Sequence, residues 1–260
     1  MPSHTTPERI ARLGDVPDRF PLAEAARQVE QLAEQYCRST TIPYDVEGHN
    51  ALLLRARGMQ THVLTLLARW KQTGDDRFRG AVIDHLREIA TWEYWSWITM
   101  RKGDSRPEAF FDLSYGENAT TLALTWDWLG ETMDDGEREL MLGLVRKWVV
   151  HPCLENTDRQ DKPHWYHNEH SNWNTVCCGG AGMVALAMYE QLGDDAEQIL
   201  RRVEASVKTY MDTLERTGGG WEEGIGYWNY GMRYAFMYLL SWERALGESH
   251  PLMERASTRA

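Results

Sequence analysis

The chain has 260 residues, of which 42% are hydrophobic and 26% are charged. This is the composition of an ordinary globular protein, and it excludes a disordered chain, a collagen-like fibre and a disulfide-dense mini-protein. The 39 acidic and 28 basic residues give a formal net charge of −11, which disfavours a protein that coats nucleic acid. Twelve tryptophans and eleven tyrosines stand against five phenylalanines, and these amphipathic rings suit wet clefts as well as cores.

Membrane and redox signals are weak. No apolar run approaches the ~20 residues that span a bilayer, and the first residues lack the basic and apolar segments of a signal peptide. We expect a cytoplasmic protein that binds no membrane, or a periplasmic or secreted one if a leader has been removed. The cysteines Cys37, Cys153, Cys177 and Cys178 lack the spacing of a zinc site or a disulfide framework.

Apolar residues recur at three- and four-residue steps along most of the chain, whereas strand signals are nearly absent. This pattern predicts helices over about 22–37, 50–71, 78–98, 117–130, 136–150, 172–191, 195–215 and 231–246. The long connections 99–116, 151–171 and 216–230 remain as loops. We expect one all-α domain over 1–260, with a short lead-in over 1–20.

The connections between predicted helices recur. The turns Leu13-Gly14-Asp15, Gly74-Asp75, Asp134-Asp135 and Gly193-Asp194 are about sixty residues apart, the length of a helical hairpin with its connections. Glycine can end one helix in the left-handed conformation, and aspartate can cap the next. The spacing predicts an array of about four hairpins, an incomplete (α/α) toroid, with its long loops on one rim.

The connection before the helix at 172–191 is rich in histidine and asparagine. It reads His164-Trp165-Tyr166-His167-Asn168-Glu169-His170-Ser171-Asn172-Trp173-Asn174. The following helix terminus presents unpaired N–H donors that favour an anion. The three histidines are three residues apart, but no helical motif of carboxylate and histidine accompanies them, so we expect no metal.

The connection before the last predicted helix combines glycines with acids and aromatics. It reads Gly218-Gly219-Gly220-Trp221-Glu222-Glu223-Gly224-Ile225-Gly226-Tyr227-Trp228-Asn229-Tyr230-Gly231-Met232-Arg233-Tyr234. Three consecutive glycines indicate a backbone that bulky residues resist. The density of polar groups after this hinge favours a functional loop.

Together these segments resemble the heparinase II/III-like polysaccharide lyase superfamily, which includes alginate lyases and related uronyl epimerases. The run Asn172-Trp173-Asn174-Thr175-Val176-Cys177-Cys178-Gly179-Gly180 is similar to its Asn-Trp-Asn…Val-Cys…Gly-Gly segment. The run from Trp221 to Gly231 is similar to its Glu-Gly…Tyr-Trp…Tyr-Gly segment. The likeness covers about 50–246 and implies an α/α toroid, a uronic-acid polysaccharide as substrate and β-elimination as the reaction.

The resemblance also implies roles for single residues. Asn172 or His170 would neutralise the uronate carboxylate, and Tyr227 would act as general acid, and as base if a cation such as Arg233 lay nearby. Stabilising the enediolate that forms when C5 loses its proton requires such a neutraliser, and the leaving O4 requires an acid. The residues expected to contact substrate are His167, Trp173, Glu222, Glu223, Trp228, Tyr230 and Arg233.

The chain departs from the family in one respect. Full-length lyases of this kind carry a β-sandwich domain after the toroid, and it contributes a second histidine and the metal of some relatives; this sequence shows no β-rich half. We therefore expect no metal and no cofactor. A homo-oligomer or a separate β-sandwich partner would complete the site. Because the net charge is −11, local cations would have to attract a polyanion: Arg101, Lys102, Arg159, Lys162 and Arg233.

Two other functions remain open. An α/α-toroid glycoside hydrolase would need paired carboxylates, for which Asp112, Glu117, Glu222 and Glu223 are available. A non-catalytic carbohydrate-binding module would use the aromatic groove alone. Replacing Tyr227 by Phe separates these functions, because only the lyase needs its hydroxyl.

Overall fold

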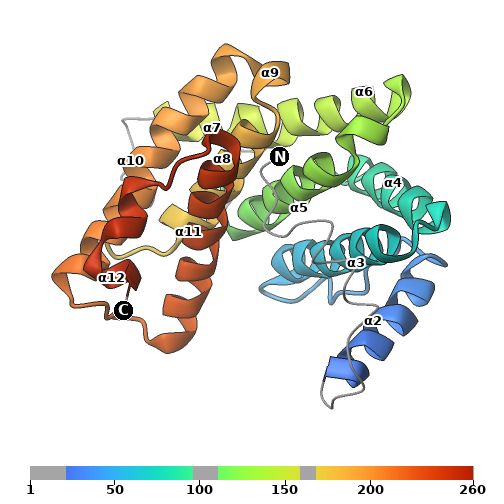
Figure 1. Cartoon of the computed structure of the whole chain (residues 1–260), viewed down its shortest axis with the longest axis horizontal. Coiled ribbons are helices and arrows are strands. Elements are labelled where there is room, and N and C mark those ends of the chain that lie inside the picture. Colours follow the sequence, from blue (N-terminus) through green and yellow to red (C-terminus); the bar gives the residue numbers. More distant parts are fainter. Residues whose placement is uncertain (1–21, 96–110, 159–167, 260) are drawn as a thin grey trace.

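A computed structural model of the chain describes residues 22–95, 111–158 and 168–259. These residues are all-α and contain no strand (Figure 1). The helices are α2 (Leu22–Tyr36), α3 (Ala51–Thr73), α4 (Asp76–Ala90), α5 (Leu113–Leu129), α6 (Asp135–Val145), α7 (His151–Asp158), α8 (Trp173–Ala187), α9 (Tyr189–Leu192), α10 (Asp194–Arg216), α11 (Ile225–Leu246) and α12 (Ala256–Arg259). Short 3-10 turns cover Gly130–Thr132 and Pro251–Glu254, and a π turn covers Arg146–Val150.

Four of these helices, α3, α5, α8 and α11, pack side by side in chain order. Contacts join positions near their starts: Arg57 of α3 pairs with Glu117 of α5, and Thr175 of α8 donates to the Gly231 carbonyl of α11 at 2.8 Å. The amino-terminal ends of the four helices therefore lie next to one another. We call the side where they begin, at residues 51, 113, 173 and 225, the amino-terminal edge.

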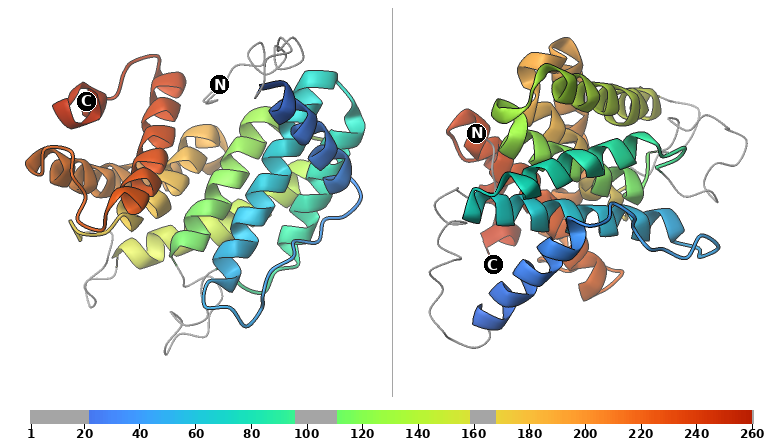
Figure 2. Two further views of the ribbon diagram at one scale, coloured as in Figure 1. Left: turned by 90° about the horizontal axis from the view of Figure 1, so that it is seen from below. Right: turned by 90° about the vertical axis from the view of Figure 1, so that its right-hand side faces the viewer.

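The remaining long helices cover this row. Helices α2 and α4 pack on α3, α6 packs on α4, and α10 packs on α8. Helices α2 and α12 lie at opposite ends of the molecule in Figure 1 and in the left view of Figure 2. One large apolar cluster extends from Ala33 to Leu252 through these layers and forms the main core. No described helix is long and apolar enough to cross a bilayer.

Helices α5 and α8 touch backbone to backbone. A Cβ on Gly116 would lie 2.4 Å from the Val176 carbonyl oxygen, and a Cβ on Gly180 would lie 2.5 Å from the Gly116 carbonyl oxygen. Any side chain at either position would therefore push the two helices apart. This close approach explains why α8 contains glycines that lower its intrinsic helix propensity.

The predicted glycine–aspartate turns hold at some positions and fail at others. Gly74 ends α3 with φ 69° in the left-handed region, and Asp75 caps α4 by accepting from the Arg77 N–H. Asp134 caps α6 in a reciprocal capping box with Glu137. Gly193 has φ 54° and ψ −126° and no side-chain cap follows it. The turn at 13–15 lies outside the described residues.

Several predicted boundaries are wrong. Helix α4 ends at Ala90 rather than 98, and α5 begins at Leu113 rather than 117 because Asp112 accepts from the Ser114 and Tyr115 N–H groups. The connection 151–171, predicted as a loop, contains α7. The 172–191 helix breaks at Met188. Helix α11 begins at Ile225 rather than 231, so Tyr227, Trp228 and Tyr230 lie on a helix instead of a loop.

Candidate functional site

The two predicted loops meet at the amino-terminal edge. The His170 Nδ1 atom, before α8, lies 2.8 Å from a carboxylate oxygen of Glu222, before α11. The neighbouring Glu169 pairs with Arg216 at the end of α10 at 2.5 Å. These two ion pairs join the segment before α8 to both ends of the connection 217–224. The described part of the first loop is therefore fixed against the second.

Asn172 occupies the N-cap position of α8 without capping it. Its backbone carbonyl accepts from the N–H groups of Thr175 and Val176 at 3.2 Å, but its side chain makes no cap bond. The residue is 2% exposed, and among the described residues its Nδ2 group has no hydrogen-bond partner. A buried amide donor without a partner costs about 1–3 kcal/mol, and an oxyanion placed beside it would remove that cost.

Two asparagines near Asn172 set the shape of this loop. The Asn168 Oδ1 atom accepts from the His170 N–H at 3.0 Å, which forms an Asx turn. The Asn174 Nδ2 group donates to the Asn168 carbonyl at 2.9 Å. These bonds hold the backbone on both sides of Asn172 in place.

His170 lies between two carboxylates. Its Nδ1 atom faces Glu222 at 2.8 Å and its Nε2 atom faces Glu169 at 3.4 Å. A positive charge on this half-exposed ring would be neutralised within the protein. Asn172, by contrast, keeps an unpaired side-chain donor among the described residues. Glu223 is exposed and accepts from the Trp221 Nε1 group at 3.0 Å.

Three tyrosines share one face of α11. Tyr227, Tyr230 and Tyr234 are three and four residues apart, the spacing that stacks side chains on a helix. Their exposure falls along the helix: Tyr227 is 51% exposed, Tyr230 is partly buried and Tyr234 is fully buried. The hydroxyl of Tyr227 is thus the one that solvent and a large ligand can reach.

A buried carboxylate at Glu117 organises this face. Glu117 of α5 is fully buried and accepts from the hydroxyls of Tyr230, at 2.7 Å, and Tyr234. It also accepts from the Arg57 Nε group at 3.0 Å and lies 3.9 Å from the Arg233 guanidinium. Burial, and then the charge of Glu117, raises the pKa of Tyr230 and of Tyr234 far above the usual tyrosine value. Both tyrosines therefore remain protonated.

The other predicted substrate contacts have different surroundings. Trp173 packs with Tyr230 against a small apolar cluster at the amino-terminal edge, formed by Leu53, Leu113, Val176 and Tyr234. Trp228 packs against the main core. His167 lies outside the described residues, as do the predicted cations Arg101, Lys102, Arg159 and Lys162.

The carboxylates that a hydrolase would need already make contacts within the protein. Asp112 is buried and caps α5, and Glu117 is buried among two tyrosines and two arginines. Glu222 and Glu223 are exposed but bind His170 and Trp221. Two of the four carboxylates are therefore buried, and the other two already contact protein side chains.

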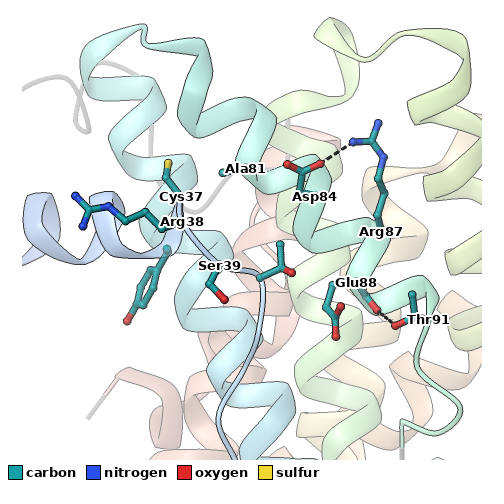
Figure 3. A pocket seen from close by; sticks show the side chains of 10 residues that line it. Cys37, Arg38, Ser39, Ala81, Asp84, Arg87, Glu88 and Thr91 are labelled. Carbon is teal, nitrogen blue, oxygen red and sulfur yellow. Dashed lines mark hydrogen bonds and ion pairs between the residues drawn. The ribbon is translucent and has the colours of Figure 1, made fainter.

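No predicted site residue lines the pocket in Figure 3. This pocket of about 510 Å³ lies between the segment after α2 and helix α4, where Asp84 and Arg87 form an ion pair at 2.7 Å. Among the described residues no group of three histidines, cysteines or acids is placed to hold a metal.

The sequence comparisons give no relative. No protein-family model matches the chain, and no curated protein matches it. The resemblance to the heparinase II/III-like lyases therefore rests on the residues named above, and the roles of those residues are proposals.

Proposed function

We propose that the protein is a polysaccharide lyase that cleaves uronic-acid-containing glycans by β-elimination. The observation that carries the proposal is the meeting of the two loops through His170 and Glu222. It puts the unpaired amide of Asn172 and the exposed hydroxyl of Tyr227 on the same edge, at the starts of two helices that Thr175 and Gly231 join.

In this proposal Asn172 neutralises the substrate carboxylate. The C5 proton of a uronate is weakly acidic because its neighbour is an ionised carboxylate, and removing it places further charge on that group. A hydrogen bond from Nδ2 stabilises the developing enediolate. Asn172 suits this task because its backbone is fixed and its Nδ2 group has no competing partner among the described residues.

Tyr227 and His170 divide the proton transfers. Tyr227 donates a proton to the leaving O4, because the hydroxyls of Tyr230 and Tyr234 already donate to Glu117. The C5 proton passes to the Nε2 atom of His170, and Glu222 orients the ring through Nδ1. The C5–H and C4–O4 bonds break, a C4–C5 double bond forms, and no cofactor is consumed.

The scaffold proposed for this chemistry is an incomplete α/α toroid. The row of α3, α5, α8 and α11, packed in chain order, and the outer helices α2, α4, α6 and α10 support it. Glu117 adds support because it binds side chains of both α3 and α11, which lie on either side of the α5–α8 pair. The same proposal includes a second copy of the chain or a β-sandwich partner that completes the cleft. Light scattering tests for the second copy, because a monodisperse monomer would contradict self-association.

The test is a scan of alginate, heparan, chondroitin, hyaluronan and glucuronan for rising ultraviolet absorbance from a 4,5-unsaturated product. We expect Tyr227→Phe to abolish the rise. Tyr189→Phe is the matched control, because Tyr189 is also an exposed tyrosine but lies on α9, away from the amino-terminal edge. No rise on any polymer with a folded chain would contradict the proposal. Saturable binding that Tyr227→Phe leaves unchanged, without turnover, would indicate a carbohydrate-binding module.

A further inference from the structure

The charges around Glu117 do not balance. One buried carboxylate faces two guanidinium groups, Arg57 at 3.0 Å and Arg233 at 3.9 Å. The side chain of Glu117 is fully buried, whereas the side chains of Arg57 and Arg233 remain 43% and 51% exposed. The cluster therefore presents a net positive charge to solvent, although the chain as a whole carries −11.

Each guanidinium group contacts aromatic rings as well as Glu117. Both lie against the ring of Tyr230, with Arg57 at 4.9 Å and Arg233 at 5.5 Å from its centroid. Arg233 also lies 5.0 Å from the centroid of Tyr234. The two tyrosine hydroxyls are fixed in turn by Glu117. An arginine that is already ordered loses less entropy when it binds a ligand, so this arrangement favours recognition.

The cluster lies at the proposed cleft. Tyr230 and Trp173, the residue after Asn172, pack against the same small apolar cluster, and Tyr230 and Tyr227 share one face of α11. A polysaccharide bound across this edge would carry a carboxylate on neighbouring sugars, not only on the sugar that is cleaved. Planar carboxylates are the partners that guanidinium groups bind best, through paired N–H···O bonds.

We propose that Arg57 and Arg233 form a carboxylate subsite, anchored by Glu117, for a uronic acid next to the sugar that is cleaved. The inference rests on the proposed function for its substrate class. It assigns Glu117 a positioning role: this carboxylate touches no substrate but sets the place of both arginines. Substrates with consecutive uronic acids should then be preferred over those with one acidic sugar among neutral ones.

Binding, measured by tryptophan fluorescence or calorimetry, tests the subsite without turnover. The probes are tetrasaccharides of mannuronan and glucuronan, their carboxyl-reduced analogues, and inorganic sulfate. We expect at least one uronate tetrasaccharide to bind, and Arg233→Gln to weaken that binding by about 10- to 100-fold, the usual effect of losing a charge-assisted contact. The carboxyl-reduced analogue should bind the wild type only weakly. Arg233→Gln should bind this analogue with the same low affinity as the wild type. Competition by sulfate as strong as by the tetrasaccharide would overturn the assignment to a carboxylate.

Arg87→Gln is the matched control, since Arg87 is an exposed arginine in an ion pair at the remote pocket. Arg57→Gln and Glu117→Gln follow, each with a thermal melt, and Arg233→Lys should restore part of the affinity. Because the Arg233 side chain is half-exposed, Arg233→Gln keeps the test valid even if the Glu117 variant fails to fold. Wild-type affinity in Arg233→Gln, or no uronate binding by the wild type, overturns the subsite. Binding without product formation contradicts the lyase but leaves the subsite standing.

Discussion

The Nδ1 atom of His62 on α3 lies 3.1 Å from the Nε2 atom of His85 on α4, in the buried layer between the two helices. The other ring nitrogen of His85 lies 2.7 Å from the Ala81 carbonyl, which can only accept. His85 therefore carries its proton on Nδ1, and its Nε2 atom accepts from the Nδ1–H of His62. Tyr36 stacks on the His62 ring with centroids 3.5 Å apart. The bond between the rings needs one nitrogen without a proton, so it is lost when both rings carry a positive charge.

This pair predicts acid sensitivity of the fold. Burial, together with repulsion from His85, lowers the pKa of His62 from 6.5 to about 4, and burial lowers the pKa of His85. Below pH 6.5 these histidines bind protons in the unfolded chain but not in the folded chain. The free energy of unfolding therefore falls as the pH drops from 7 towards 4. His62 alone should account for about 2 kcal/mol of lost unfolding free energy between pH 7 and pH 5. Urea denaturation at the two pH values measures it.

His62→Leu provides the comparison for this pH effect. The variant should be less stable at pH 7, because the His85 Nε2 atom loses its donor, but its stability should depend less on pH. An unfolding free energy that falls equally steeply in both proteins would assign the acid sensitivity to other groups.

Two glycine substitutions should have opposite effects on stability, because only one of the two glycines lies in the contact between α5 and α8. Gly116→Ala would bring a methyl group to 2.4 Å from the Val176 carbonyl oxygen, so the helices must separate. We expect a loss of about 1–3 kcal/mol or more in unfolding free energy. In Gly143→Ala, on α6, the new methyl meets no atom within 4 Å, and stability should rise by up to ~1 kcal/mol through helix propensity. Thermal melts compare the two, and equal melting temperatures would contradict the close packing.

The tyrosines of α11 should separate stability from activity. Tyr230→Phe removes a 2.7 Å hydrogen bond to buried Glu117 and should cost about 1.5–3 kcal/mol of stability. Tyr227→Phe alters an exposed side chain and should leave the melting temperature unchanged while abolishing product formation. Calorimetry and the absorbance assay on the same samples measure both properties. A melting temperature lowered equally by the two substitutions would show that Tyr227 has a structural role.

The cysteines should differ sharply in reactivity. Cys153, Cys177 and Cys178 are buried, and burial raises the pKa of the last two thiols well above the usual value. Cys37, at the pocket in Figure 3, is partly exposed, although burial also raises the pKa of its thiol. We expect one slowly reacting thiol in the native protein and four in urea, counted with a chromogenic disulfide reagent. Rapid reaction of several native thiols would contradict the burial of Cys177 and Cys178.

Helical class and several boundaries could be predicted from the sequence because apolar periodicity and capping residues are local signals. Helix α3 and helix α10 follow the prediction within about two residues, as expected for such signals. The missed helix α7 begins at His151 and carries Pro152 in its first turn, where a helix tolerates proline. Proline had indicated a break there. The early start of α11 follows Gly224, whose φ of 91° ends the preceding turn without any capping side chain.

The organisation of the site could be predicted only in part. The two loops were identified because their polar residues are contiguous in sequence. The Glu117 cluster was not, because Arg57, Glu117 and Tyr230 come from three helices and are far apart in the chain. The sequence marked Glu117 only as one of several carboxylates. A glutamate within a helix that is buried on all sides requires partners, but nothing local identifies them.

The bonds of Glu117 also bear on how the protein unfolds. In most stacked-hairpin proteins each unit contacts only its neighbours, so the ends can fray while the middle stays folded. Here one carboxylate on α5 binds side chains of α3 and α11, so losing the last long helix leaves a buried charge without its tyrosine donors. Unfolding of the carboxyl-terminal helix alone therefore costs free energy, because it removes hydrogen-bond donors from Glu117, which is far away in sequence. We expect fluorescence and circular dichroism to report one concerted transition rather than sequential loss of hairpins.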